Sequence, residues 1–264
     1  MSRESLRVTL VQAELAWHDA AENRRTFERL LAPLAGQTDL VVLPEMFTTG
    51  FTMAPQSAAE PAGGPSVEWM HAMAARLGAV VTGSIATRDG ASYFNRLTWM
   101  RPDGSSAVYD KRHLFRMAHE DEHYACGATR LITDLDGWKI RPLVCYDLRF
   151  PVWSRNRIGT AEGYDVLIYV ANWPERRRYA WQTLLRARAI ENLCYCIGVN
   201  RVGRDANDIH YKGDSAAIDF LGQALGPATE HEFVATVTLE RAPLAAFRSK
   251  FPAHLDADDF ELRR

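Results

Sequence analysis

Two short apolar runs constrain the fold of this chain more than any other feature. Residues 39–43 read Asp-Leu-Val-Val-Leu, and residues 165–170 read Asp-Val-Leu-Ile-Tyr-Val. Apolar runs of this length, without polar alternation, are typical of strands that are buried on both faces. Such strands need covering structure on both sides of their sheet, which favours an α/β fold. The likeness of the two runs also hints at a duplicated half-structure.

Strand and helix patterns alternate along the rest of the chain. Amphipathic helices are predicted for residues 20–34, 66–77 and 177–191, with Ser66 as the N-cap of the second helix and Gly78 as its stop. Strands are predicted for residues 6–11, 79–85, 96–100, 107–109, 139–144, 194–199, 216–218 and 233–239.

Turn signals add antiparallel pairs to this alternation. Residues 101–104 (Arg-Pro-Asp-Gly) and the Asp136-Gly137 pair each predict a hairpin. We therefore expect mixed sheets. Because no Gly/Ser-rich or Pro-rich linker interrupts the chain, we expect residues 1–264 to form a single domain. Residues from about 253 onward are expected to form a C-terminal surface or interface arm.

Charge and cysteine usage narrow the class of partner. Lys plus Arg total 31 and Asp plus Glu total 33, so the formal charge of −2 gives no electrostatic reason to expect nucleic acid or an anionic membrane. The four cysteines show no disulfide-framework spacing, which favours a reducing compartment. No secretory leader is evident, and no apolar run approaches the ~20 residues of a membrane helix. We expect a cytoplasmic protein with a small-molecule substrate.

Three reactive side chains follow apolar strands. Glu45 comes after residues 39–43, Lys111 after residues 107–109, and Cys145 after residues 139–144. Sites in open α/β sheets are built at strand ends, so these residues are expected to converge.

A thiol, a carboxylate and an ammonium group together could hydrolyse an amide. A free thiol has a pKa of about 8.5 and is mostly protonated at neutral pH, so it needs a base or a stabilising cation. Glu45 is the candidate base, and Lys111 the candidate cation for the thiolate. The Lys111 ammonium and the backbone N–H of Tyr146 are candidate donors to an oxyanion. Taken singly, Cys145 is equally well read as a buried hydrophobe, Glu45 as a loop carboxylate and Lys111 as a surface charge.

Four motifs favour the catalytic interpretation of these three residues over the structural one. They are Leu-Pro-Glu at residues 43–45, Tyr-Asp-Lys-Arg-His-Leu-Phe at 109–115, Leu-Val-Cys-Tyr-Asp-Leu-Arg-Phe-Pro at 143–151, and Asn-Trp-Pro at 172–174. In content and order they resemble the signature regions of the nitrilase (carbon–nitrogen hydrolase) superfamily.

The resemblance has clear structural and chemical implications. It implies an αββα sandwich of two mixed β-sheets flanked by helices, and a catalytic triad of Glu45, Lys111 and Cys145 that acts through a thioester and releases ammonia. It also implies association through the outer helices, as a homodimer or homotetramer, and neither a metal nor an organic cofactor.

Within the superfamily, the chain looks most similar to the bacterial ω-amidase-like (Nit-type) branch. The features that carry this likeness are residues 186–192 (Arg-Ala-Arg-Ala-Ile-Glu-Asn) and the sequence around Cys145. The branch implies a small ω-amide acid as substrate, such as 2-oxoglutaramate or 2-oxosuccinamate. Nitriles and N-carbamoyl amino acids are the alternative substrates for the same triad.

The superfamily also has a second glutamate near its nucleophile. The position seven residues before Gly127 is Glu120, and we expect it to fill this role, with Glu122 as its rival because loop length varies.

Four residues within these motifs are expected to bind substrate: Tyr146, Arg149, Asn172 and Trp173. A substrate carboxylate needs a cation to offset lost hydration, and either Arg149 or one arginine of the cluster at residues 176–178 is the expected partner. His113 is interpreted as a residue that organises its loop.

Other classes of function compete with this hypothesis. His119-Glu120-Asp-Glu-His123 matches the H-E-x-x-H zinc-peptidase pattern, although both intervening positions are acidic where a metal helix normally has apolar residues. Cys194 and Cys196 could form half a metal site, but their apolar neighbours favour a core strand. A non-catalytic protein that kept the fold is a further alternative, because a fold does not determine a function.

Overall fold

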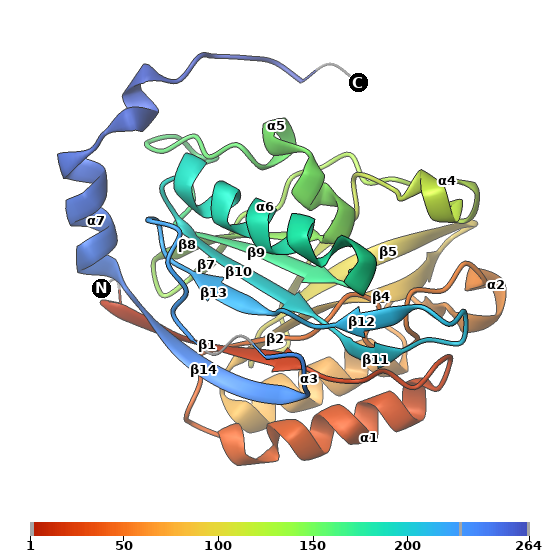
Figure 1. Cartoon of the computed structure of the whole chain (residues 1–264). Coiled ribbons are helices and arrows are strands. Elements are labelled where there is room, and N and C mark those ends of the chain that lie inside the picture. The colour runs from red at the N-terminus through yellow and green to blue at the C-terminus, as the bar shows by residue number, and fades with distance from the viewer. Residues whose placement is uncertain (1–2, 227–228, 263–264) are drawn as a thin grey trace.

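The computed structural model describes residues 3–226 and 229–262. Two β-sheets lie between two layers of helices (Figure 1). The predicted αββα sandwich of two mixed sheets is therefore confirmed.

The first sheet is built around three parallel strands. Parallel pairing joins β1 to β2 and β2 to β4, whereas β14, β5 and β6 are added by antiparallel pairing. In order across the sheet, the strands are β14 (Phe233–Glu240), β1 (Ser5–Gln12), β2 (Leu40–Val42), β4 (Val80–Asp89), β5 (Ser92–Met100) and β6 (Ser106–Asp110), and the short β3 (Glu60–Pro61) pairs with β4.

The second sheet repeats this plan. Its three central strands are parallel, and an antiparallel strand is added on each side. In order, the strands are β13 (Ala216–Ile218), β10 (Tyr195–Asn200), β9 (Val166–Ala171), β8 (Trp138–Val144) and β7 (Thr133–Leu135). A separate two-stranded ribbon consists of β11 (Val202–Arg204) and β12 (His210–Lys212).

The two apolar runs occupy equivalent positions in the two sheets. Strand β2 is the middle parallel strand of the first sheet and β9 that of the second, and every residue of both strands is buried. Leu40 and Val42 belong to the core between the sheets, whereas Val41 packs in the cluster beneath the helices. Since successive side chains of a strand point to opposite faces, a strand with two apolar environments needs a continuous apolar run.

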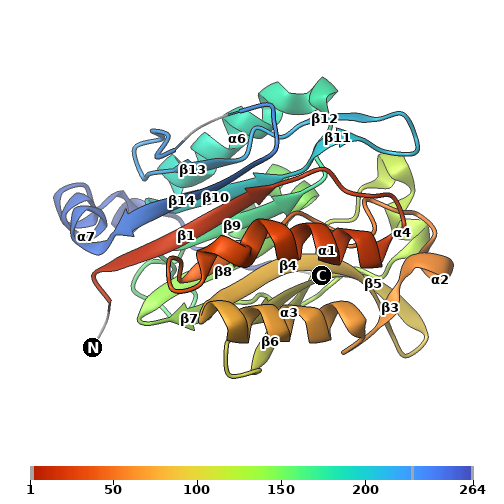
Figure 2. The same cartoon turned by 90° about the horizontal axis from the view of Figure 1, so that it is seen from below.

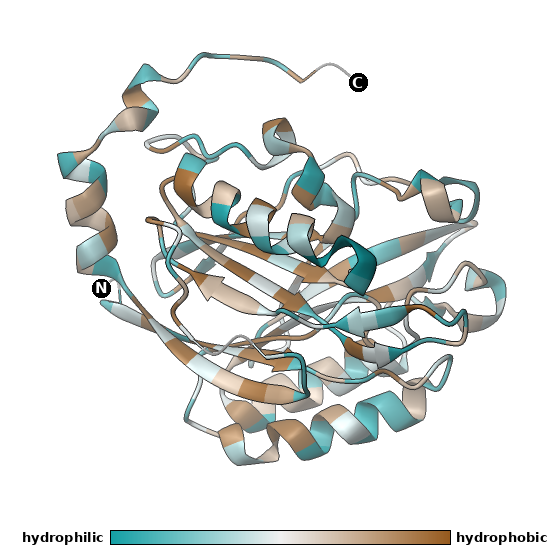
Figure 3. Cartoon of the chain, viewed as in Figure 1, coloured by the Kyte–Doolittle hydropathy of each residue, from teal (hydrophilic) through white to brown (hydrophobic). Residues whose placement is uncertain are grey.

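Helices cover the outer faces of both sheets. On the first sheet, α1 (Ala20–Leu31) and α3 (Pro65–Leu77) lie side by side (Figure 2). The second sheet is covered by α6 (Arg178–Glu191) and the short α5 (Pro151–Ser154) (Figure 1). Hydrophobic residues concentrate on the strands between these layers, while the helices carry both hydrophobic and hydrophilic residues (Figure 3).

Two short helical turns, α2 (Pro55–Ala58) and α4 (Glu120–His123), lie in connections of the chain. The last long helix, α7 (Arg241–Lys250), follows β14. Among the described residues, none of the helices combines the length and apolar character needed to cross a membrane.

The prediction that Ser66 is the N-cap of α3 was wrong. The helix begins at Pro65 with Gly64 as its N-cap, and Ser66 lies inside the first turn. Proline is well suited to the first helical position because its fixed φ matches the helix and its missing N–H is not needed there. Ser66 instead donates both its backbone N–H and its hydroxyl to Glu60, each over 2.6 Å. Gly78 ends the helix with a φ of 63°, as predicted.

The segment after α7 runs over the outside of the molecule (Figure 1). It contains a short turn, Ala253–Asp256, and the carbonyl of Phe260 accepts a hydrogen bond from Arg157. Its role as an interface arm, like the single-domain assignment, stays a prediction. Arg263 and Arg264, at its end, lie outside the described residues.

Candidate active site

The three reactive residues meet where the two sheets adjoin. Glu45 follows β2 and Lys111 follows β6, both in the first sheet, whereas Cys145 follows β8 of the second sheet. Their exposed fractions are 0% for Glu45, 1% for Lys111 and 8% for Cys145. The strand-end prediction of convergence is met by this geometry.

Cys145 occupies a strained turn between a strand and a helix. Val144 is still extended, with φ −124°, but Cys145 has a φ of +43°, and the 3-10 turn Cys145–Arg149 begins at this residue. A positive φ is unfavourable for a residue with a side chain and persists only where its surroundings enforce it. The sharp turn brings the cysteine to the wall of a pocket.

Lys111 lies between two carboxylates. Its Nζ is 2.9 Å from Oε1 of Glu45, and 3.0 and 2.8 Å from the two carboxylate oxygens of Glu120. Burial lowers the pKa of Lys111, but the charges of Glu120 and Glu45 outweigh burial and hold this pKa above its ordinary value. The side chain is therefore a cation at neutral pH.

Glu120 rather than Glu122 is the glutamate that faces Lys111. Glu120 is fully buried and also accepts the backbone N–H of Phe115 over 2.7 Å. Burial raises the pKa of Glu120, and the charge of Lys111 opposes that rise. The side chain of Glu122 is 65% exposed and contacts His119.

Asn95, which the sequence did not single out, links the two carboxylates. Its Nδ2 lies 2.8 Å from Oε1 of Glu45 and 3.2 Å from Oε1 of Glu120, and its backbone carbonyl accepts the N–H of Lys111 over 3.0 Å. The predicted strand began at residue 96, which excluded Asn95. Strand β5 also contains Ser92, Arg96 and Thr98, so a further polar residue within it gave no local signal.

Glu45 is also held from the opposite sheet. The backbone N–H of Asn172 lies 2.8 Å from its Oε2, and Nδ2 of Asn172 donates to its backbone carbonyl. Asn172 was expected to bind substrate, and in the structure it also positions this carboxylate.

The thiol of Cys145 is in its protonated form in this environment. Burial raises its pKa well above the ordinary value, and the charge and hydrogen bonding of Glu45 raise it further, whereas Lys111 lowers it. The raised pKa is less favourable to the resting thiolate that we expected Lys111 to stabilise. It favours proton removal by Glu45 when a substrate is attacked.

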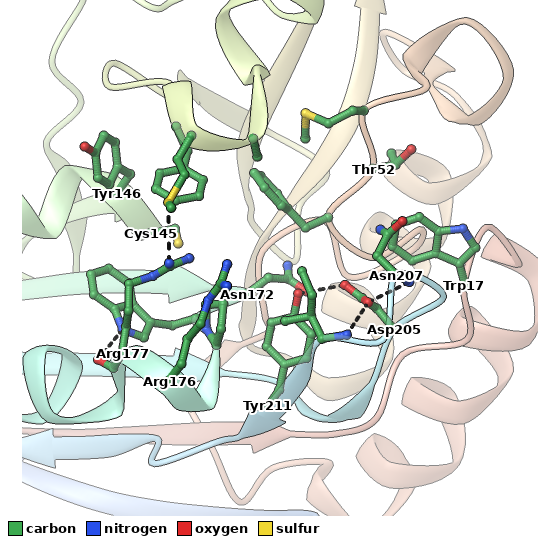
Figure 4. Close-up of a pocket in the computed structure, with 18 of the residues that line it drawn as sticks. Trp17, Thr52, Cys145, Tyr146, Asn172, Arg176, Arg177, Asp205, Asn207 and Tyr211 are labelled. Carbon is green, nitrogen blue, oxygen red and sulfur yellow. Dashed lines mark hydrogen bonds between the residues drawn. The ribbon is translucent and has the colours of Figure 1, made fainter.

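A pocket of about 560 Å³ opens onto Cys145 (Figure 4). All four predicted substrate-binding residues line it, namely Tyr146, Arg149, Asn172 and Trp173. The sequence did not indicate the far end of the pocket, where Trp17 comes from the loop after β1, and Asp205, Asn207 and Tyr211 come from the β11–β12 ribbon.

Three arginines line the same pocket. The guanidinium of Arg149 lies 4.9 Å from the ring centroid of Trp173, and that of Arg177 lies 5.0 Å from the ring of Phe115. Arg176 is the third. Burial lowers the pKa of Arg177, and the charges of Arg176 and Arg149 lower it further.

Arg178, the last of the predicted arginine cluster, is engaged elsewhere. It forms ion pairs with Asp214 and Glu230, each over 2.7 Å. Of these three adjacent arginines, Arg176 and Arg177 line the pocket and Arg178 does not.

The H-E-x-x-H sequence does not adopt the arrangement that a zinc helix requires. His119 precedes the single turn α4 with a φ of 58°, its side chain is 69% exposed, and Glu120 is turned inward to Lys111. Within residues 3–226 and 229–262, no three His, Cys, Asp or Glu side chains are grouped so as to hold a metal ion. Cys194 and Cys196 are fully buried in the core between the layers.

Comparisons with known proteins agree with this geometry. The family model for carbon-nitrogen hydrolase matches residues 7–249. The chain is 47% identical to the omega-amidase YafV of Escherichia coli (strain K12), over 97% of this chain and 98% of that protein. It is 31% identical to the 2-oxoglutaramate amidase of Bacillus subtilis (strain 168), over 94% and 96% of the two chains.

A solved structure gives the same result. XC1258 from Xanthomonas campestris, a CN-hydrolase superfamily protein with an arsenic adduct in its active site, superimposes with a TM-score of 0.96 at 53% identity, over 99% of this chain and 100% of that one. The chain belongs to the carbon–nitrogen hydrolase family, as the resemblance of its motifs predicted.

Proposed function

We propose that this carbon–nitrogen hydrolase is an amidase that releases ammonia from a short ω-amide acid, such as 2-oxoglutaramate or 2-oxosuccinamate. The observation that carries the proposal is a pocket with Cys145, beside Lys111 and Glu45, together with three arginines. Among the described residues, no carboxylate forms an ion pair with Arg149, Arg176 or Arg177. The names of the two amidase relatives support the same substrate class.

The chemistry follows from the positions of the three reactive groups. Glu45 removes the proton of Cys145 as the sulfur attacks the amide carbon, and the carbonyl oxygen becomes an oxyanion. The Lys111 ammonium and the Tyr146 backbone N–H donate to that oxyanion. The C–N bond then breaks, the amine leaves as ammonia with the proton held by Glu45, and a thioester remains. Water activated by Glu45 hydrolyses the thioester and restores the thiol.

Glu120 acts in this scheme through Lys111. Its two oxygens accept hydrogen bonds from Lys111, Asn95 and the Phe115 N–H. These contacts fix the direction of the ammonium group towards the reacting carbonyl. We assign Glu120 to the catalytic site for this reason.

The arginines explain the preference for an acidic substrate. Burial lowers the pKa of Arg177, and repulsion from the guanidinium groups of Arg176 and Arg149 lowers it further. A substrate carboxylate relieves that repulsion and exchanges its lost hydration for charge-assisted hydrogen bonds. Arg149 and Arg177 are the better candidates because both are partly buried, whereas Arg176 is exposed.

The test is ammonia release from a panel that contains 2-oxoglutaramate, an uncharged amide of similar length, a nitrile and an N-carbamoyl amino acid. The ω-amide acid should give the highest kcat/KM. Arg149→Ala and Arg177→Ala should each lower kcat/KM for the acidic amide by about 10- to 100-fold, the equivalent of a lost hydrogen bond to a charged group. The neutral amide should be affected less.

Arg88→Ala is the matched control, because Arg88 is exposed at the end of β4, lies outside the outer helices and does not line the pocket. This variant should leave kcat/KM unchanged for both the acidic and the neutral amide. A wild-type preference for the neutral amide or the nitrile would refute the ω-amidase assignment and leave the family assignment intact.

We further propose that the chain acts as one cytoplasmic catalytic domain and forms a homodimer or homotetramer through its outer helices. The four unpaired cysteines support a reducing compartment. The exposed side chains of Tyr179 (78%) and Ile190 (49%) on α6 support an association through this helix. Light scattering on the purified protein tests the assembly, and a monomer at micromolar concentration would contradict it.

A further inference from the structure

A buried carboxylate outside the proposed triad lies close behind the nucleophile. Asp147 is two residues after Cys145, is fully buried, and is not among the residues that line the pocket. Its Oδ2 accepts the hydroxyl of Tyr109 over 2.8 Å and the backbone N–H of Val144 over 3.1 Å. Its Oδ1 accepts two donors of His113, the backbone N–H over 3.0 Å and Nδ1 over 2.7 Å.

These four donors come from the segments that carry the two key residues of the site. Val144 immediately precedes Cys145 at the end of β8. Tyr109 lies two residues before Lys111 and His113 two residues after it, at the end of β6. Because β6 and β8 belong to different sheets, one carboxylate ties the strained cysteine turn to the lysine segment of the other sheet.

The partners of Asp147 are themselves held in place. The Tyr109 oxygen accepts the indole N–H of Trp153 over 2.9 Å, and the His113 ring stacks on Phe150 at 3.8 Å with an interplanar angle of 9°. Burial raises the pKa of Tyr109, and the charge of Asp147 raises it further, so the hydroxyl keeps the proton that it donates. Tyr109 and His113 are therefore both held with their donors facing Asp147.

We propose that Asp147 is a positioning residue for the hydrolysis, and that His113 and Tyr109 are the groups through which it fixes Lys111 relative to Cys145. The proposal rests on the catalytic roles assigned above. Asp147 does not touch the reacting atoms, but a displacement of about 1 Å between catalytic groups can cost ~10²-fold in rate. Loss of this carboxylate should therefore loosen both the turn that carries Cys145 and the segment that carries Lys111.

Asp147→Asn is the informative change because it preserves size and shape. The amide NH₂ would face two of the N–H and O–H donors, so at least one hydrogen bond becomes a donor–donor contact. We expect kcat on 2-oxoglutaramate to fall by about 10²-fold, with KM changed only a few-fold. Alkylation of Cys145 by iodoacetamide, followed by mass spectrometry at neutral pH, should slow as well.

Asp39→Asn is the matched control. Asp39 is a similarly buried carboxylate that accepts several donors of Arg7, before β2 and away from the pocket. Its loss should lower the thermal midpoint and leave kcat and the alkylation rate unchanged. A purely structural role for Asp147 predicts the same pattern for Asp147→Asn, and that outcome would overturn the proposal.

A second pair of variants tests the network where Asp147→Asn does not fold. His113→Asn keeps an Nδ2–H near the position of the histidine Nδ1–H, whereas His113→Leu removes it. We expect kcat and the alkylation rate to be higher in His113→Asn than in His113→Leu, and equal values would overturn the proposal.

Alkylation needs no amide substrate, so the two proposals can fail separately. A wild-type protein that hydrolyses none of the ω-amides refutes the proposed substrate. The Asp147 network is then still judged by whether Asp147→Asn slows alkylation of Cys145.

Discussion

The backbone N–H of Asn172 lies 2.8 Å from Oε2 of Glu45, while the other oxygen of that carboxylate is 2.9 Å from Nζ of Lys111. Asn172 belongs to a loop of the second sheet, and the other two residues to the first. The carboxylate is thus oriented by both sheets at once. The site depends on how the sheets pack as much as on the residues within it.

Glu45→Gln should lower kcat by about 10²- to 10⁴-fold, the usual contribution of a general base. It should also shift the titration of Cys145. The negative charge of Glu45 raises the pKa of the thiol, so its removal should lower that pKa. The rate of iodoacetamide alkylation, measured against pH, should therefore reach its midpoint at a lower pH in the variant. A midpoint that moves upward would contradict the role of Glu45.

Lys111→Met should lower kcat by at least ~10²-fold, because it removes a donor to the oxyanion. It also leaves two buried carboxylates without their cation, at a cost of roughly 3–5 kcal/mol in the free energy of unfolding. The double variant Lys111→Met/Glu120→Gln should recover part of that stability in urea and none of the activity. If the single variant is as stable as the wild type, the ion pairs with Glu45 and Glu120 do not hold Lys111 as described.

Glu120→Gln and Glu122→Gln form a matched pair, because the two residues lie two positions apart in α4 but in different environments. Glu120 contacts Lys111 in the buried site, whereas Glu122 is exposed and contacts His119. Initial rates of ammonia release should therefore drop in the first variant and stay near wild type in the second. The reverse order would transfer the second-glutamate role to Glu122.

Stability should fall in alkaline solution, because burial raises the pKa of several core phenols above their ordinary value of 10.0 and that of a core thiol above its ordinary value of 9.0. The folded protein keeps these protons after the unfolded chain has lost them, so the stabilisation is complete below about pH 9 and decreases as pH rises further.

Tyr169→Phe tests the contribution of one such group, since burial raises the pKa of this phenol in the core of β9. Above pH 10 the free energy of unfolding should fall less steeply in the variant, by about 1.4 kcal/mol per pH unit. Urea unfolding at a series of pH values gives this slope. Parallel slopes in wild type and variant would show that Tyr169 ionises equally in both states.

The parts of the fold that the sequence predicted well are those with a strong hydrophobic period. The runs that became β2 and β9 are buried on both faces, and α1 and α6 each bury one face, so the local pattern alone indicated each element. The β11–β12 ribbon was missed because its strands are three residues long and largely polar. Helix α7 was missed as well, and Pro243 in its first turn interrupts the pattern although proline is tolerated there.

The reactive groups of the candidate site, its second glutamate Glu120 and four residues of the pocket wall were predictable from the sequence. Cys145, Lys111 and Glu45 could be found because each follows an apolar strand in a recognisable motif. The supporting groups Asn95 and Asp147 act through contacts with residues far away in the sequence, so no local pattern identifies them. Which arginines of residues 176–178 line the pocket likewise depends on helix geometry and on partners in distant loops.

Intact-mass spectrometry after rapid acid quenching of the enzyme with 2-oxoglutaramate tests most directly whether the acyl group of an ω-amide acid is transferred to Cys145. We predict a covalent increase equal to the mass of the substrate less ammonia, located on the peptide that contains Cys145. It should persist in Cys126→Ala, which removes an exposed thiol, and be absent in Cys145→Ala together with all turnover. An adduct on another residue, or a Cys145→Ala protein that still releases ammonia at the wild-type rate, would contradict the account.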